Sequence, residues 1–150
     1  MKTLIVYYSR TNVTKDLCLK VQSKLNCDIE EITETKNRDG ALNYLKSCLD
    51  AIRGTKTDIK PTKNDPSNYD LVIIASPVWA GTMANPVLTY LNQNNSKFPK
   101  IALVSTCGGD CTGALMKMSE NIGKEPIATL TRKNGENADL KIEDFVKSLN

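Results

Sequence analysis

The chain of 150 residues has the length of one domain, and a domain of that size buries roughly 70% of its unfolded surface without needing cross-links. Apolar residues make up 40% and charged residues 25%, which excludes a disordered or fibrous protein and predicts a single globular domain over residues 1–150. The net charge of +3 is small and the lysines are spread along the chain, so neither indicates nucleic-acid binding.

The absence of histidine is the most informative count in the composition. It excludes Ser-His-Asp and Cys-His catalysis, a histidine proton shuttle and histidine metal sites, and we assign no catalytic residue and no metal ligand. Five cysteines without a CxxC pair favour a reduced, cytoplasmic protein. The sequence has no signal-peptide pattern and no apolar stretch approaching ~18 residues, so we expect no membrane association.

Short apolar runs alternate with helical patterns along the chain. A strand over residues 4–8 is followed by a helix with an apolar stripe at Val13, Leu17, Val21 and Leu25. A weaker strand over residues 27–32 precedes a second amphipathic helix with its stripe at Leu42, Leu45, Leu49 and Ile52. Residues 55–69, with two prolines and many polar side chains, form the one long connection.

The second half repeats the alternation. A strand over residues 71–75 precedes a helix that begins at Asn85-Pro86, and a strand over residues 101–104 precedes a helix that ends at Gly123. An edge strand over residues 127–130 and a last helix through Ile142, Phe145, Val146 and Leu149 complete the chain. The strict alternation predicts an α/β fold: a doubly wound, five-stranded parallel sheet in the order 2-1-3-4-5, as the middle of three α/β/α layers.

In such a sheet ligands bind beyond the carboxyl ends of the strands, where the strand order reverses. That rule selects three loops: residues 9–14, 76–83 and 106–113. The first loop opens a helix and carries the hydroxyls of Ser9, Thr11 and Thr14, so it predicts a phosphate cradle at the positive end of a helix dipole. The other interpretation is that these residues only cap the helix.

The second loop contains Trp79, the one tryptophan of the chain, on a turn that we expect to be partly exposed. Its indole either stacks on a planar ring or covers the core, and Gly81 allows close approach of the backbone. The third loop has Gly108-Gly109 between Cys107 and Cys111. We interpret the two cysteines as small residues filling a tight loop rather than as a redox disulfide, because no CxxC motif and no neighbouring Lys or His is evident.

Other phosphate-binding motifs are absent from these loops. The first loop lacks GxGxxG and Walker sequences, and neither the acidic pattern of a receiver domain nor the Cys and Arg of a related phosphatase is found.

The chain resembles flavodoxins over essentially its whole length. VYYSRTNVT (residues 6–14) is similar to the loop that holds the FMN phosphate, and SPVWAGTMANPV (residues 76–87) is similar to the loop beside the flavin ring. The resemblance implies a flavodoxin-like fold and one non-covalent FMN. It implies that the phosphate is held by residues 9–14, the ring by Trp79 and Gly81, and the pyrimidine edge by residues 106–110. The implied cofactor-binding residues are Ser9, Arg10, Thr11, Asn12, Val13, Thr14, Pro77, Val78, Trp79, Ala80, Gly81, Thr82, Thr106, Cys107, Gly108, Gly109 and Asp110.

Three features depart from the family pattern. Asn12 stands where a small residue, commonly Gly, is usual, and Asn tolerates a positive φ better than most residues. The third loop lacks the aromatic residue that many flavodoxins place on the second face of the ring, which leaves that face open. The chain is slightly basic, whereas flavodoxins are usually acidic.

Two functions are compatible with this pattern. The first is an electron-transfer protein that passes electrons through FMN between redox partner proteins. The alternative is an NAD(P)H-dependent quinone or flavin reductase that uses the same FMN with a small acceptor. The short chain favours the carrier, whereas the open third loop and the basic charge favour the reductase.

Overall fold

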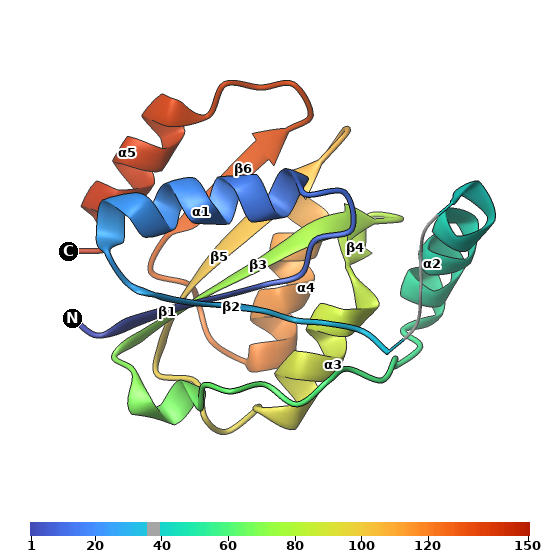
Figure 1. Ribbon diagram of the computed structural model, residues 1–150, viewed down its shortest axis with the longest axis horizontal. Helices are drawn as coiled ribbons and strands as arrows, with labels where there is room; N and C mark the ends of the chain where they lie inside the picture. Colours follow the sequence, from blue (N-terminus) through green and yellow to red (C-terminus); the bar gives the residue numbers. More distant parts are fainter. Residues whose placement is uncertain (36–39) are drawn as a thin grey trace.

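The computed structural model describes residues 1–35 and 40–150 as a parallel sheet between two layers of helices (Figure 1). The parallel strands are β1 (Thr3–Tyr7), β2 (Asp28–Glu31), β3 (Leu71–Trp79), β5 (Lys100–Cys107) and β6 (Thr129–Lys133). They are hydrogen-bonded in the order β2-β1-β3-β5-β6. Counted among the parallel strands alone this is the order 2-1-3-4-5, so the predicted fold is confirmed.

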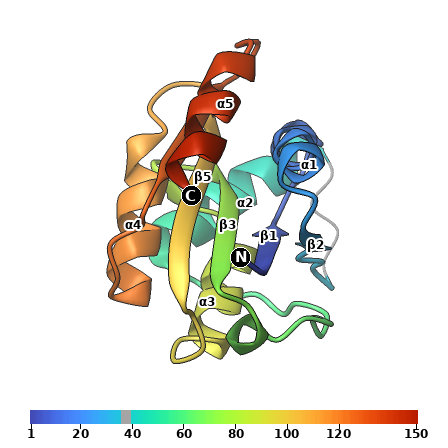
Figure 2. The same ribbon diagram turned by 90° about the vertical axis from the view of Figure 1, so that its left-hand side faces the viewer.

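Helices cover both faces of the sheet. Figure 2 shows α1 and α4 on opposite sides of the strands. One face carries α1 (Val13–Leu25) and α5 (Asp139–Ser148), and the other carries α2 (Ala41–Arg53), α3 (Asn85–Gln93) and α4 (Thr112–Ile122). The connection before β3 holds a short 3₁₀ helix, η1 (Pro66–Asn68). In the part of the chain that the structure describes, no helix is long and apolar enough to cross a membrane.

The core has two halves because successive side chains of each strand point to opposite faces. Ile5 and Ile73 pack toward the first pair of helices, where Leu17 and Phe145 lie. Leu4, Val72, Ile74 and Leu103 pack toward the second group, with Tyr90 and Met118 among their neighbours. Burial of the central strands on both faces explains their nearly continuous apolar sequences.

The predicted second loop is a β-hairpin, so its assignment as a loop is wrong. β3 continues through Trp79, and the two-residue strand β4 (Thr82–Met83) pairs antiparallel with its end. Between them, Ala80 and Gly81 both have positive φ values, 49° and 78°. Two positive φ values in a two-residue connection are typical of type I′ hairpin turns, whose twist matches that of the strands.

Helix α2 turns its apolar stripe outward, although an amphipathic helix ordinarily packs its apolar stripe against the core. Leu42, Leu45, Leu49 and Ile52 are 82%, 59%, 50% and 68% exposed. The helix packs through its small residues instead, since Ser47 and Ala51 are buried. In Figure 1, α2 stands at the side of the molecule toward which β3 runs.

Candidate functional site

The carboxyl ends of β1, β3 and β5 lie side by side, because these strands are parallel neighbours in register. The three loops selected from the sequence therefore start at one edge of the sheet. Three contacts hold them together: the Tyr8 and Trp79 rings meet edge to face with their centroids 5.4 Å apart, the Thr14 and Thr106 hydroxyls are 2.8 Å apart, and Gly113 lies against the Gly81 carbonyl. Each contact joins two different loops, so the site is one structural unit.

The first loop leads into α1 through Asn12, whose φ of 66° is left-handed, the conformation for which its residue type is suited. The Asn12 side chain makes no capping hydrogen bond to the helix, and Thr11 and Asn12 are exposed. Ser9 Oγ accepts a hydrogen bond from the Lys15 backbone N–H at 3.3 Å. The first hydrogen bond of the helix runs from the Asp16 N–H to the Asn12 carbonyl oxygen at 2.9 Å, so the N–H groups of Val13 and Thr14 precede it, and this end offers donors and a positive dipole to an anion.

Two residues of the first loop have partners inside the protein. The Thr14 side chain is buried against Thr106, so its hydroxyl joins the first and third loops and does not lie at the surface. The Arg10 guanidinium lies over the ring of Tyr44 in α2, 4.7 Å from its centroid. Arg10 is half-buried rather than pointing freely into solvent, and it connects the loop to α2.

Trp79 is not partly exposed as the sequence suggested. Only 2% of its surface is accessible, and it packs in the core with Tyr8, Val87 and Met83. The reason is that β3 continues to Trp79, so its side chain falls on the inner face of the sheet. In this conformation the indole offers no face to a flavin ring, and the exposed parts of the hairpin are Ala80 and Gly81, with Pro77 and Val78 half-buried beside them.

The third loop presents backbone at the surface. Gly108, Gly109 and Asp110 are exposed, whereas Thr106 and Cys107 are buried. The Asp110 carboxylate accepts hydrogen bonds from the Thr112 backbone N–H at 2.9 Å and from its hydroxyl at 2.7 Å. These hydrogen bonds, with a smaller contribution from Lys133, lower the pKa of Asp110 below its ordinary value. The loop therefore carries a negative charge at neutral pH.

Cys107 and Cys111 form a disulfide across this loop, with their Cα atoms 5.3 Å apart. The prediction that they are reduced, space-filling residues is wrong for this pair. The expectation that no lysine lies beside them is wrong as well, because Lys133 is the register partner of Cys107 on β6. Lys133 lies far from Cys107 in sequence, and only the pairing of β5 with β6 brings the two together. Cys18, Cys27 and Cys48 are free.

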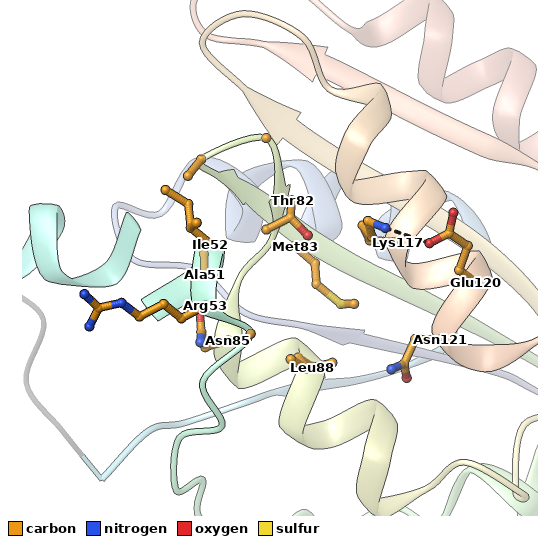
Figure 3. Close-up of a pocket in the computed structure, with 13 residues that line it drawn as sticks. Ala51, Ile52, Arg53, Thr82, Met83, Asn85, Leu88, Lys117, Glu120 and Asn121 are labelled. Atoms are coloured by element: carbon orange, nitrogen blue, oxygen red, sulfur yellow. Dashed lines mark hydrogen bonds and ion pairs between the residues drawn. The ribbon is translucent and has the colours of Figure 1, made fainter. Parts of the chain in front are cut away.

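A separate pocket of about 700 Å³ lies behind the hairpin, between α2, α3 and α4 (Figure 3). Thr82 and Met83 line it from the hairpin, and Lys117 and Glu120 line it from α4, joined by an ion pair of 2.9 Å. Of the three loops, the hairpin is the one that contributes to its lining. The pocket therefore shares the hairpin with the site, including Ala80 and Gly81, and its other lining residues come from the helices and the residue after α2.

Sequence reasoning missed Tyr44 and Gly113. Tyr44 lies on a helix whose sequence shows an amphipathic pattern and no sign of a contact with the first loop. Gly113 falls inside the third loop, but its close contact with the hairpin follows from the packing of α4 and leaves no signal in the sequence.

The fold and the converging loops define a flavodoxin-like α/β protein, which confirms the resemblance seen in the sequence. No family model matches the chain, and no curated protein is similar enough to count as a match. More particularly, the chain is similar to a flavoprotein from Lactobacillus acidophilus whose crystal structure holds FMN. The two are 29% identical over 96% of this chain and 97% of that one, with a TM-score of 0.78.

More distant structures share the fold. A flavodoxin from the domain Archaea is 14% identical over 99% of this chain and 93% of its own, with a TM-score of 0.57. A WrbA-like flavodoxin from Agrobacterium tumefaciens is 10% identical over 97% and 95%, with a TM-score of 0.61. At these identities the likeness concerns the fold alone.

Proposed function

We propose that this protein binds one FMN non-covalently and uses it to transfer electrons. The observation that carries the proposal is the likeness to the Lactobacillus acidophilus flavoprotein in complex with FMN, which extends over nearly the whole length of both chains. When bound, FMN supplies reversible transfer of one or two electrons. The protein supplies the binding surface and its electrostatics.

The first loop and the start of α1 fit a phosphate. Thr11 and Asn12 are exposed, the Asn12 side chain makes no capping hydrogen bond, and the hydroxyls of Ser9 and Thr11 add donors to the backbone N–H groups. A terminal phosphate at this place distinguishes FMN from riboflavin. The exposed backbone of Gly108 and Gly109 and the hairpin turn at Gly81 are the surfaces left for the ring.

Trp79 has a different role from that of a residue stacked on the flavin ring. A buried indole holds Tyr8 and the hairpin in place, so its contribution to FMN binding is to position the site. The negative charge of Asp110 opposes additional negative charge on a reduced flavin held by the third loop.

Titration of the apoprotein with FMN and with riboflavin tests the assignment. We expect FMN to bind more tightly, and Ser9→Ala to weaken FMN while leaving riboflavin unchanged. Ser23→Ala is the matched control, since Ser23 is an exposed serine on α1 that bonds to the Lys20 carbonyl. Equal affinity for the two flavins would contradict phosphate recognition at α1, and failure to bind either flavin would contradict the proposed function.

Between carrier and reductase we favour an electron carrier in the cytoplasm, working with redox partner proteins. The described surface gives the ring an exposed backbone loop rather than an enclosing cavity, which suits transfer through a ring edge. The pocket behind the hairpin adds to the open third loop and the basic charge in favour of the alternative, since it is large enough for a small acceptor or a nicotinamide ring. Anaerobic addition of NADPH and then NADH to the FMN-loaded protein separates the two functions, because prompt bleaching of the flavin band indicates a reductase.

A further inference from the structure

We propose that Cys107 and Cys111 form a redox-active disulfide that accepts two electrons from the reduced flavin held by the same loop. The inference rests on the proposed FMN site and adds a second redox centre to it. The two cysteines bracket the exposed backbone of residues 108–110, which is one of the surfaces assigned to the flavin.

A purely structural disulfide is poorly explained at this position. The two cysteines are four residues apart, and closing so short a loop constrains the unfolded chain much less than a long one does. A chain of 150 residues with two packed core halves does not depend on such a cross-link. The other three cysteines are free, as in a compartment where a disulfide is usually transient or catalytic.

The surroundings favour thiol chemistry. Cys111 is the N-cap residue of α4, where the helix dipole stabilises a thiolate. Lys133, the register partner of Cys107, brings positive charge to the same end of β5. Its charge also reaches Asp110 in the middle of the loop. Opposing these, the Asp110 carboxylate carries a negative charge, but its oxygen is engaged by Thr112.

A backbone carbonyl oxygen lies near each of the two sulfurs. Cys107 Sγ lies 3.3 Å from the Gly109 carbonyl oxygen, and Cys111 Sγ lies 3.7 Å from the Arg132 carbonyl oxygen. Each sulfur therefore lies near a carbonyl oxygen that can accept a hydrogen bond from its S–H once the bond is reduced and the two sulfurs have moved apart. Nearby acceptors for both thiols favour a pair that can cycle.

In the proposed step, a bound two-electron-reduced flavin would supply two electrons and two protons and return to its oxidised form. The Sγ–Sγ bond takes up both electrons and breaks, and each sulfur takes up one of the protons to become a thiol. Because 6% of Cys107 and 4% of Cys111 is exposed, a partner protein has little access to the sulfurs, so the flavin is the favoured electron source.

The test counts electrons and thiols in the FMN-loaded protein. Anaerobic dithionite titration of the wild type is expected to consume two electrons per protein more than the Cys107→Ser variant. After reduction, acid denaturation and alkylation, the number of free thiols is expected to rise from three to five in the wild type. Cys27→Ser is the matched control, since Cys27 is a free, half-buried cysteine away from the loop. The Cys27→Ser variant is expected to consume as many electrons as the wild type.

Two outcomes would overturn the inference, and they can be told apart. If FMN binds and is reduced while the thiol count stays at three, the disulfide is structural and the proposed function stands. If the protein binds no FMN, the inference and the proposed function fail together. Thermal unfolding of Cys107→Ser, an almost isosteric change, verifies that a lost response does not come from a lost fold.

Discussion

The contact between Gly113 and Gly81 gives the sharpest test of how the site is assembled. A Cβ atom added at Gly113 would lie 2.0 Å from the Gly81 carbonyl oxygen, a backbone atom that cannot rotate away. Gly113→Ala therefore requires α4 and the hairpin to separate by more than ~1 Å. Overpacking of this kind costs about 1–3 kcal/mol, and the rigid backbone on the other side places this case at the upper end.

The gain in helix propensity from glycine to alanine is smaller than this packing cost. Alanine is favoured over glycine in a helix by up to about 1 kcal/mol, and Gly113 lies in the first turn of α4, where less of that gain is realised. We expect a net loss of about 2 kcal/mol in the free energy of unfolding, which lowers Tm by about 4–8 °C in a chain of this length. FMN affinity is expected to fall too, because the hairpin turn moves away from the third loop.

Gly109→Ala is the matched control for this experiment. Gly109 is in the same loop, and a Cβ added there has open space around it. We expect its free energy of unfolding to change by no more than about 0.5 kcal/mol either way, the range of surface substitutions, so its Tm should stay close to that of the wild type. Thermal denaturation of both variants alongside the wild type decides the question. Equal Tm values for Gly113→Ala and Gly109→Ala would refute the close packing of α4 on the hairpin.

Three further predictions concern the rest of the fold. Asn12→Ala is expected to cost about 1 kcal/mol because it places an ordinary residue at positive φ, whereas Asn12→Gly should be nearly neutral; urea denaturation compares them. Leu17→Ala removes a fully buried side chain and should lower the free energy of unfolding by about 2–5 kcal/mol. Leu49→Ala, on the outward stripe, should lower it by less than about 1 kcal/mol. Similar losses in the two variants would show that α2 packs inward. The pKa of Asp65 is lowered from 3.8 to about 2 by hydrogen bonds from the Ser67 backbone and side chain and from Lys97. Between those values the unfolded state binds more protons, so stability should fall as the pH drops from about 4 to 2, and the fall should be smaller in Asp65→Asn.

The sheet could be predicted from the sequence because burial on both faces leaves a direct signal. Residues 71–75 and 101–104 are nearly continuous apolar runs, and they lie in the first part of β3 and β5. The polar end of β3 carries no such signal. Ser76 and Pro77 look like the start of a loop, but the strand continues through them, and this error also placed Trp79 at the surface.

Helix α2 shows where periodicity misleads. An apolar stripe identifies a helix, but it does not say which side packs against the protein. In α2 the small residues Ser47 and Ala51 allow close approach to the neighbouring elements, and the leucines are left outside. The amphipathic pattern therefore gave the right element with the wrong orientation.

In the site too, features set by neighbouring residues could be predicted, and features set by tertiary contacts could not. The left-handed conformation at Asn12 depends on one residue type and its place before a helix, and it was expected from the sequence. The environment of Cys107 depends on Lys133, which arrives through the register of β5 with β6. Since charge and access decide whether a cysteine pair is reactive, the sequence alone favoured an inert pair, and the tertiary arrangement reverses that preference.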